Sequence, residues 1–464
     1  MTGATLEISG PAEHAVFQRD EKGEAKIEVR VKTSGSARMR ARLRQGHKAV
    51  KGFGWTELTL IDGVGTIKGV PTGGPYTFDI VQLGDKGDTL SSGSVGDLLV
   101  GDLWIMAGQS NMDGCGKLHN AEKPSRNVHA FYYDDRWDVA HQPLCWYAEA
   151  TDVVHRPQDP DGRPIEELIQ SARHWQETGA GPAVSFANAI HKTVGVPVGI
   201  VVCSHGGTSM SQWDPSRADE GGNSLYGSML RRVNAVGGKV TGCIWYQGES
   251  DSTGEDAIEA FHDRFTDLIA AFRSDCGDPS MPFIYVQLAS VFMGDFEIGW
   301  NRIQNTQLEI ESEIDNTAVA VAIDSSLCDI IHIDSASAKR VGRRLARLAQ
   351  ILAYGDAELR RGPRPIRFEF DDEERKVLRV GYDQVNGRLQ PTNHVWGFSA
   401  WDGDDRRPIA TAIVDPDQPT DVVLTFEKPL PKNCDLWYGR GLNPSVNLID
   451  GADMAAPVFG PVIV

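Results

Sequence analysis

The chain has 464 residues, of which 64 are acidic and 46 are basic, so its formal net charge at pH 7 is −18. A surface this acidic repels phosphate backbones and anionic lipids, and we therefore expect neither a nucleic acid nor a membrane as a partner. The length exceeds what one hydrophobic core usually serves, which predicts two or three domains.

The apolar runs, the N-terminal residues and the cysteines give little indication of the cellular compartment of the protein. No run approaches the roughly 20 apolar residues of a membrane span, and residues 1–14 lack the basic and apolar regions of a signal peptide. We expect a cytoplasmic protein, or a secreted or periplasmic one whose leader has been removed. The seven cysteines are scattered and form no CxxC pair, so neither a zinc site nor a redox site is expected.

Residues 1–97 are predicted to form an N-terminal β module. Runs that alternate apolar and polar residues occur at 25–33, 37–45 and 76–84, and glycine-rich turns such as 71–75 separate them. A period of two is typical of strands with one buried face, and tight turns favour antiparallel pairing. We expect a sandwich-like fold.

Residues 98–360 are predicted to form an α/β domain. Apolar segments alternate with helical patterns, which favours a parallel sheet with helices on both faces. The segments expected as strands are 98–107, 196–203, 240–246, 282–289 and 317–323. The prolines, tryptophans and acidic turns between about 113 and 180 predict an irregular insertion.

The spacing of apolar residues predicts two helices in this domain. Helical spacing places six large side chains on one face of the first helix: Ile258, Phe261, Phe265, Leu268, Ile269 and Phe272. A similar face in the last helix consists of Val341, Leu345, Leu348 and Leu352, and Asp334 or Ser335 is expected to cap its N-terminus. We interpret both faces as core.

Residues 361–464 are predicted to form a second β module. A glycine and proline cluster at 360–365 ends the helical pattern, and strand-like runs return at 422–430, 434–441 and 456–464. The sequence does not predict what this module does, nor how many copies of the chain associate.

The turns that follow the predicted parallel strands contain polar residues of types that can take part in catalysis. Ligands of an open parallel sheet bind beyond the carboxyl ends of its strands, so these turns are expected to meet. A serine hydroxyl is a weak nucleophile unless an imidazole takes its proton and a carboxylate fixes that imidazole. We expect Ser110 as nucleophile, His332 as general base and then acid, and Asp329 as the residue that orients His332.

Attack by a serine on an ester creates an oxyanion that needs preorganised donors. The backbone amides of Ser110 and Gly207 and the side-chain amide of Gln247 are the expected donors, with Gly206 as the alternative glycine. The glycines also suit a sharp turn, and Gln247 also suits a bracing role. Glu249 is expected to accept hydrogen bonds and is left outside the catalytic set.

Other interpretations of the same residues stay open. Asp324, Asp329, His332 and Asp334 are of the types that hold a divalent ion, although no second group with recognisable ligand spacing is present. His205 is the alternative imidazole. Trp213 is the candidate for stacking on a sugar ring, whereas aromatic residues beside a sheet more often pack into the core.

Four motifs in this order resemble the carbohydrate-esterase branch of the SGNH (GDSL-type) hydrolases: GDLWIMAGQSNM, GGTSMSQW, WYQGESD and DIIH. The likeness is greatest to sialate O-acetylesterases and acetylxylan esterases and spans roughly residues 98–352, with a fainter extension into the N-terminal module. It implies a flavodoxin-like catalytic domain, Ser110 as nucleophile, the pair Asp329 and His332, and oxyanion roles for Gly207 and Gln247.

The expected activity is therefore hydrolysis of O-acetyl esters of carbohydrates through an acyl-enzyme, without a metal or organic cofactor. A short-chain lipase or thioesterase of the same fold is the alternative within the enzymes. A non-catalytic carbohydrate-binding protein is the alternative outside them, because two β modules and several tryptophans accompany the central domain.

Overall fold

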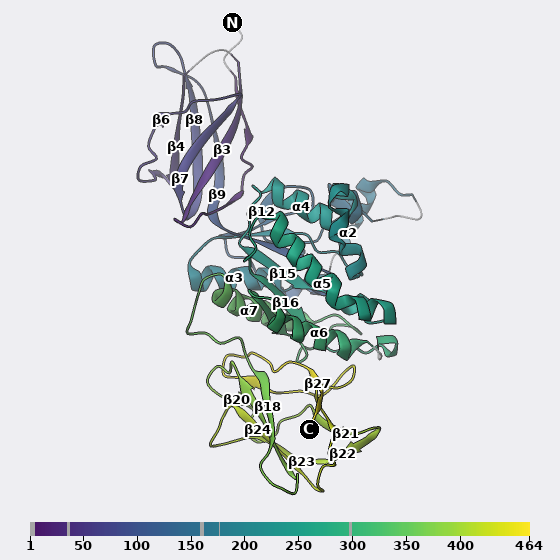
Figure 1. Cartoon of the computed structure of the whole chain (residues 1–464). Helices are drawn as coiled ribbons and strands as arrows, with labels where there is room; N and C mark the ends of the chain where they lie inside the picture. Colours follow the sequence, from purple (N-terminus) through teal and green to yellow (C-terminus); the bar gives the residue numbers. More distant parts are fainter. Residues whose placement is uncertain (1–4, 35–37, 158–161, 176, 297–298) are drawn as a thin grey trace.

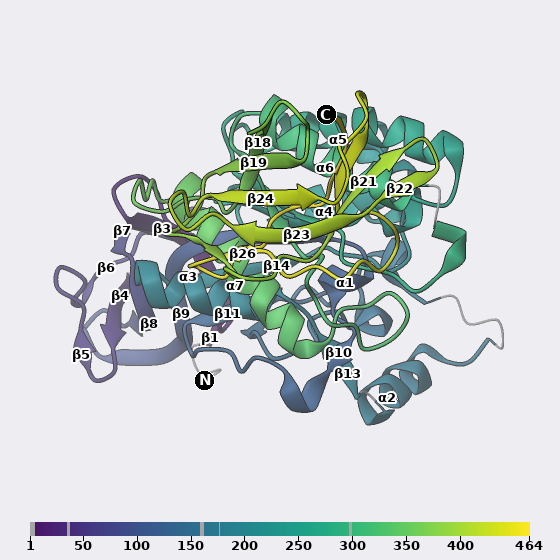
Figure 2. The same cartoon turned by 90° about the horizontal axis from the view of Figure 1, so that it is seen from below.

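The computed structural model describes residues 5–34, 38–157, 162–175, 177–296 and 299–464. An α/β part occupies the centre, with one β module at each end (Figure 1). Viewed at right angles, the strands of the C-terminal module cover one end of the central part (Figure 2). The predicted mixed α/β class with additional β modules is thus confirmed.

The N-terminal module consists of two antiparallel layers around a small core. One sheet has the order β1-β3-β7, and the other pairs β4 with β8 and β8 with the first half of β9. Alternate residues of β3 point inward, as the sequence period predicted. The strands are β1 (Leu6–Gly10), β2 (Val16–Gln18), β3 (Glu24–Thr33), β4 (Arg38–Gln45), β5 (Lys48–Ala49), β6 (Thr56–Glu57), β7 (Val64–Pro71), β8 (Gly73–Leu83) and β9 (Thr89–Gly108).

The long strand β9 connects this module to the central sheet. Its first part pairs antiparallel with β8, and its last residues pair in parallel with β14 and β15. From Leu98 to Gly108 every residue is buried, because both faces of a parallel sheet are covered.

The central sheet has the order β12-β11-β14-β9-β15-β16-β17, and all neighbours are parallel except β11 and β12. All five segments predicted as parallel strands lie in it. The bounds are β11 (Val128–Phe131), β12 (Trp137–Val139), β14 (Val198–Val202), β15 (Gly242–Tyr246), β16 (Phe283–Gln287) and β17 (Thr317–Val321).

Helices cover this sheet, with α3 packed against α7 and α5 packed against α6. The six predicted core residues of α5 are buried, and Asp334 caps α7 by accepting a hydrogen bond from the Ser337 amide at 2.7 Å. The helices are α1 (Ser110–Asp113), α2 (Ile165–Trp175), α3 (Ala183–Val194), α4 (Leu225–Ala235), α5 (Glu255–Asp275), α6 (Trp300–Glu313) and α7 (Ser335–Leu352). None of the helices in the described ranges is both long and apolar enough to cross a membrane.

The predicted insertion is not irregular throughout, because it supplies β11 and β12 to one edge of the central sheet. It contains α2, the short pair β10 (Gly116–Lys117) and β13 (Thr178–Ala180), and several single turns of 3₁₀ helix. Its residues 158–161 and 176 lie outside the described residues.

The C-terminal module consists of two four-stranded antiparallel sheets that enclose a second core. Their orders are β18-β19-β24-β23 and β22-β21-β25-β27, and buried residues of both sheets form one cluster. The strands are β18 (Arg364–Phe370), β19 (Val377–Asp383), β20 (Leu389–Gln390), β21 (Phe398–Asp402), β22 (Asp405–Arg407), β23 (Ile409–Val414), β24 (Asp421–Phe426), β25 (Asp435–Tyr438), β26 (Ile449–Asp450) and β27 (Phe459–Ile463).

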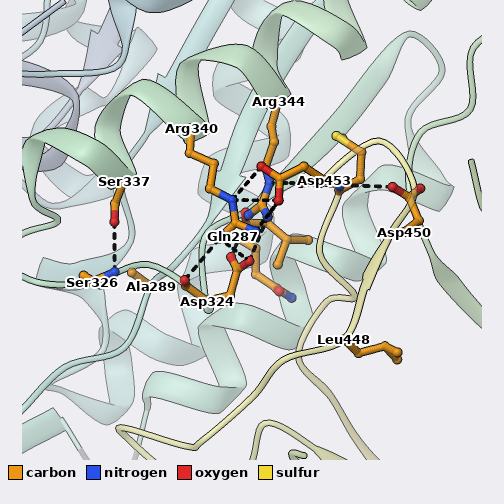
Figure 3. A network of polar contacts seen from close by, with 12 residues as sticks. Gln287, Ala289, Asp324, Ser326, Ser337, Arg340, Arg344, Leu448, Asp450 and Asp453 are labelled. Carbon is orange, nitrogen blue, oxygen red and sulfur yellow. Dashed lines mark hydrogen bonds and ion pairs between the residues drawn. The ribbon is translucent and has the colours of Figure 1, made fainter. Parts of the chain in front are cut away.

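A polar network fastens the C-terminal module to the central part (Figure 3). Arg344 of α7 donates to both carboxylate oxygens of Asp324 at 2.6 and 2.8 Å and to the backbone oxygen of Asp453 at 2.7 Å. Arg340 pairs with the carboxylates of the same two aspartates. The side chain of Gln287 both donates to and accepts from the backbone of Val458. Buried, charge-assisted hydrogen bonds of this kind resist separation of the two parts.

Arg344→Ala is expected to lower the free energy of unfolding by about 3 kcal/mol, because it removes one partner of a buried ion pair and leaves the Asp324 carboxylate less compensated. Arg343→Ala on the exposed face of the same helix is the matched control and should change stability by less than about 0.5 kcal/mol. Urea unfolding followed by tryptophan fluorescence measures both. Equal effects of the two substitutions would contradict the structural role given to this network.

Candidate active site

The turns after β9, β14, β15 and β17 meet beyond the carboxyl ends of the central strands, as the sequence predicted. β9 ends at Gly108 and is followed by Ser110, the first residue of α1. Gly108 has φ of 125°, and a Cβ atom there would lie 2.2 Å from the backbone oxygen of Tyr246. Only glycine lets the chain leave the strand at this point, so the sequence itself places the serine at the sheet edge.

Ser110, His332 and Asp329 form one hydrogen-bonded chain. The Nε2 atom of His332 lies 2.9 Å from the Oγ atom of Ser110, and its Nδ1 atom lies 2.7 Å from Oδ2 of Asp329. These three residues come from segments more than 200 positions apart. The geometry is that of a nucleophile, a base and a residue that fixes the tautomer of the base.

The Asp329 carboxylate is held by several donors. Its Oδ1 atom accepts from the backbone amides of Ile331 at 2.9 Å and His332 at 2.7 Å. Partial burial acts to raise the pKa of Asp329, but the hydrogen bonds from the His332 ring and from these amides outweigh it and hold that pKa below its usual value. The carboxylate therefore stays ionised while it orients the imidazole.

Asn111 joins the serine turn to the histidine loop. Its Oδ1 atom accepts from the Ile333 amide at 3.0 Å, and its Nδ2 atom donates to the Ile331 oxygen at 3.3 Å and to Oε1 of Glu249 at 2.7 Å. The two backbone contacts bracket His332. The sequence analysis missed this residue, although it directly follows Ser110 in the first motif.

Glu249 is buried beneath this junction, and burial raises the pKa of its carboxyl group. Its contact with Asn111 agrees with the expectation that it accepts hydrogen bonds, although the donor is a side chain rather than a backbone amide. Its Oε2 atom is buried without a hydrogen-bond partner among the described residues.

The structure distinguishes Gly206 from Gly207, the two glycines that the sequence offered as oxyanion donors. The amide of Gly206 donates to the Tyr147 hydroxyl at 2.7 Å, so it is already used. Gly207 has φ of 70°, and its amide has no hydrogen-bond acceptor in the described parts of the chain. The Ser110 amide likewise has none there. These two N–H groups are available to an incoming oxyanion.

The expectation that Gln247 donates to the oxyanion is wrong in this structure. Its side chain is completely buried, and its Nε2 atom donates to the Thr208 backbone oxygen at 3.0 Å and to Oδ2 of Asp251 at 2.5 Å. Both amide hydrogens are thereby used. Asp251 also accepts from the Met210 amide at 2.9 Å, so the pair braces the turn after β14.

The expectation that Trp213 contacts a sugar is also wrong. Its side chain has no exposed surface, its indole nitrogen donates to Oγ1 of Thr208 at 3.0 Å, and its ring packs edge-on against Trp245. Trp213 is a core residue, because the helical turn that carries it folds back over the sheet.

The insertion supplies residues to this site that the sequence analysis did not single out. The Tyr147 hydroxyl donates to Oδ2 of Asp113 while it accepts from the Gly206 amide. Burial raises the pKa of Asp113 to about 6, against the opposing hydrogen bonds from Ser204, Tyr147 and Cys145. Asp113 lies three residues after Ser110. These contacts therefore connect the turn that carries Ser110 to the turn that carries Gly206 and Gly207.

The residues of the two alternative interpretations, a second imidazole and a divalent-ion site, have other partners. The Nδ1 atom of His205 lies 3.0 Å from Nδ1 of His155, and its ring packs on Tyr147. Asp324 is paired with two arginines and Asp334 caps α7, so these carboxylates do not join Asp329 and His332 in one ligand set.

Comparison with known proteins agrees with the geometry. The profile of a family described as carbohydrate esterase, sialic acid-specific acetylesterase, matches residues 100–350. A probable carbohydrate esterase of Arabidopsis thaliana is 29% identical over 209 residues, which cover 40% of this chain and 69% of that protein. Sialate O-acetylesterase of Mus musculus is 24% identical over 389 residues and 67% of each chain.

One solved structure is similar along nearly the whole chain. A carbohydrate acetylesterase from Xanthomonas citri superposes with a TM-score of 0.64 and 24% identity, covering 98% of this chain and 99% of that one. The likeness concerns the fold, and it extends over both β modules as well as the central part.

Tyr147→Phe is expected to lower kcat about tenfold with little change in KM, because the Gly206 amide and Asp113 lose their shared partner and the adjacent Gly207 amide loses its fixed direction. Hydrolysis of nitrophenyl acetate measures both constants. Tyr132→Phe is the matched control, since within the described ranges the Tyr132 hydroxyl bonds to the backbone oxygens of Val139 and His141 alone. An unchanged kcat for Tyr147→Phe would remove the positioning role.

Asp113 is expected to make stability depend on pH. Its pKa is about 6 in the folded chain against a usual value of 3.8, so the folded chain binds this proton more tightly than the unfolded chain. The resulting stabilisation is fully present below about pH 4 and is lost as the pH rises through about 6. Asp113→Asn has no proton to lose and should lack this dependence.

The measurement is the difference in free energy of unfolding between wild type and Asp113→Asn, taken at several values between about pH 4 and pH 7. The wild type is expected to lose stability relative to the variant as the pH rises. Asp404→Asn is the control, because that side chain is exposed and has no ion-pair partner among the described residues. A difference that stays constant over this range would contradict the account of Asp113.

Proposed function

The chain belongs to the carbohydrate esterase family of sialic acid-specific acetylesterases, and from this premise we propose that Ser110, His332 and Asp329 carry out its reaction. The family match covers more than half of the chain and confirms the resemblance carried by the four motifs. The protein is accordingly a carboxylic ester hydrolase of the carbohydrate acetylesterase class. The mechanism that follows rests on the hydrogen bonds between the three side chains.

In the first step the Ser110 oxygen attacks the acetyl carbonyl carbon while the Nε2 atom of His332 takes the hydroxyl proton. The negative charge that develops on the carbonyl oxygen is stabilised by the amides of Ser110 and Gly207, each worth on the order of 3 kcal/mol. The C–O bond to the sugar then breaks, and His332 returns the proton to the departing sugar hydroxyl. An acetyl ester of Ser110 remains.

In the second step water replaces the sugar. His332 takes a proton from the water, the resulting nucleophile attacks the acetyl carbon, and acetate leaves as Ser110 regains its proton. Asp329 stays ionised throughout and stabilises the charged imidazole. All of these steps use side chains and backbone amides of this chain.

We further propose that the central part is a flavodoxin-like domain of SGNH type. Counting β9, β14, β15, β16 and β17 in chain order, the observed arrangement is 2-1-3-4-5, with β11 added beside β14. The chain order reverses between β9 and β15, and Ser110 follows the end of β9 at this point. The proposed division of the chain is 1–97, 98–360 and 361–464, with β9 shared by the first two parts.

Ser110→Ala is expected to lower kcat on nitrophenyl acetate by at least about a thousandfold, the loss typical of an enzyme without its nucleophile. Ser211→Ala, an exposed serine near the glycine turn, is the control and should keep full activity. Full activity of Ser110→Ala would overturn the assignment.

The substrate is tested by acetate release from acetylated xylan, acetylated xyloglucan, O-acetylated sialic acid and monosaccharide acetates. Release from at least one of them supports the proposal. A much higher rate on nitrophenyl octanoate than on any acetyl ester would favour the lipase or thioesterase alternative instead, because that class needs a groove for a long acyl chain.

A further inference from the structure

A groove with a volume of about 1030 Å³ lies on the C-terminal module. His394, Trp396, Trp401, Arg406 and Arg440 contribute to its walls. The volume is at the upper end of the roughly 300–1,000 Å³ of small-molecule sites. The proposed reaction at Ser110 does not use this groove.

Trp396 is the most unusual residue of the groove, because its side chain is 57% exposed. A tryptophan ring in water costs free energy unless it meets a ligand. Its backbone is held at this point: the Trp396 amide donates to Oδ1 of Asn447 at 2.7 Å, and the Asn447 side chain donates to the His394 oxygen at 2.8 Å. The exposed ring is thus carried by a fixed stretch of backbone.

The groove combines this ring with hydrogen-bond donors. The Arg440 guanidinium lies over the Trp401 ring at 3.8 Å, which leaves its N–H edges free to point sideways. In the described parts of the chain neither Arg440 nor Arg406 is paired with a carboxylate. Flat apolar faces beside free donors match the surface of a pyranose ring, which has C–H faces and a rim of hydroxyl oxygens.

The groove continues towards the catalytic loop. A second hollow of about 500 Å³ shares Trp396, Pro444 and Ser445 with it, and its other wall includes residues 324–326. This segment leads directly to Asp329 and His332. Trp396, Pro444 and Ser445 thus line both hollows, and the second hollow extends from the C-terminal module to the segment that precedes the loop of the proposed base.

Backbone hydrogen bonds of residues 291 and 292 connect the C-terminal module and the catalytic loop to the same segment of the central part. The Val291 amide donates to the Leu442 oxygen of the module at 2.9 Å, and the next amide, of Phe292, donates to the Ile330 oxygen of the catalytic loop at 2.8 Å. Phe292, whose amide makes the second of these bonds, is a second exposed aromatic residue, with 60% of its surface accessible. The ion pairs of Arg340 and Arg344 hold the module in place (Figure 3).

We infer that this groove binds further sugar units of the glycan whose acetyl ester is cleaved at Ser110, with Trp396 as the stacking platform. The inference rests on the proposed function and narrows it: the preferred substrate is an acetylated oligo- or polysaccharide rather than a free monosaccharide. The C-terminal module is then a part of the substrate-binding surface.

The kinetic test compares a polymer with a small ester. Trp396→Ala is expected to lower the ratio of kcat/KM on acetylated xylan or xyloglucan to kcat/KM on nitrophenyl acetate about tenfold, equivalent to about 1.4 kcal/mol. Trp396→Phe keeps an aromatic face and should recover part of the ratio. Ile366→Ala is the control, since Ile366 is 66% exposed on the same module but outside the groove. A ratio in Trp396→Ala equal to that of wild type overturns the inference.

A binding test separates this inference from the reaction. The full chain carrying Ser110→Ala is run in native gels that contain acetylated xylan, xyloglucan, galactoglucomannan or pectin. Retardation by at least one polymer, reduced when Trp396→Ala is added, supports the groove even if the wild type shows no esterase activity. Absence of retardation in all four gels overturns it, even if the wild type releases acetate from small esters.

Discussion

The active site depends on the side chain of one buried asparagine. Asn111 directly follows the proposed nucleophile and bonds to the backbone on both sides of His332, so it sets the distance between two loops that leave different strands. An unpaired amide in this buried position would cost about 1–3 kcal/mol for each lost partner, which makes the arrangement difficult to distort. Glu249, beneath it, holds the donor side of the same amide.

Side-chain hydrogen bonds also hold the turn that carries Gly206 and Gly207. Asp251 and Gln247 brace it from β15, whereas Tyr147 and Asp113 hold it from the insertion. The neighbouring acceptors are occupied by other donors, and the amides of Gly207 and Ser110 have no acceptor among the described residues. The proposed oxyanion site is thus preorganised by hydrogen bonds that are complete before any substrate binds.

Much of this could be predicted from the sequence, and what could not has a physical reason. Strands buried on both faces and the stripe on α5 have strong local patterns, and Ser110, Asp329 and His332 follow strand ends in recognisable motifs. Whether Gln247 or Trp213 faces the site or the core depends on packing between segments far apart in sequence. Tyr147 was missed because the insertion has no periodic pattern, so only the folded chain reveals that it reaches Gly206.

A covalent acyl-enzyme at Ser110 can be detected by trapping the nucleophile. The protein is treated with a fluorophosphonate, which forms a stable ester with an activated serine, and the adduct is located by peptide mass spectrometry. We expect one adduct per chain, on the peptide that contains Ser110, with loss of esterase activity in proportion to labelling. An adduct on another residue that abolishes activity, or full activity after complete labelling of Ser110, would contradict it.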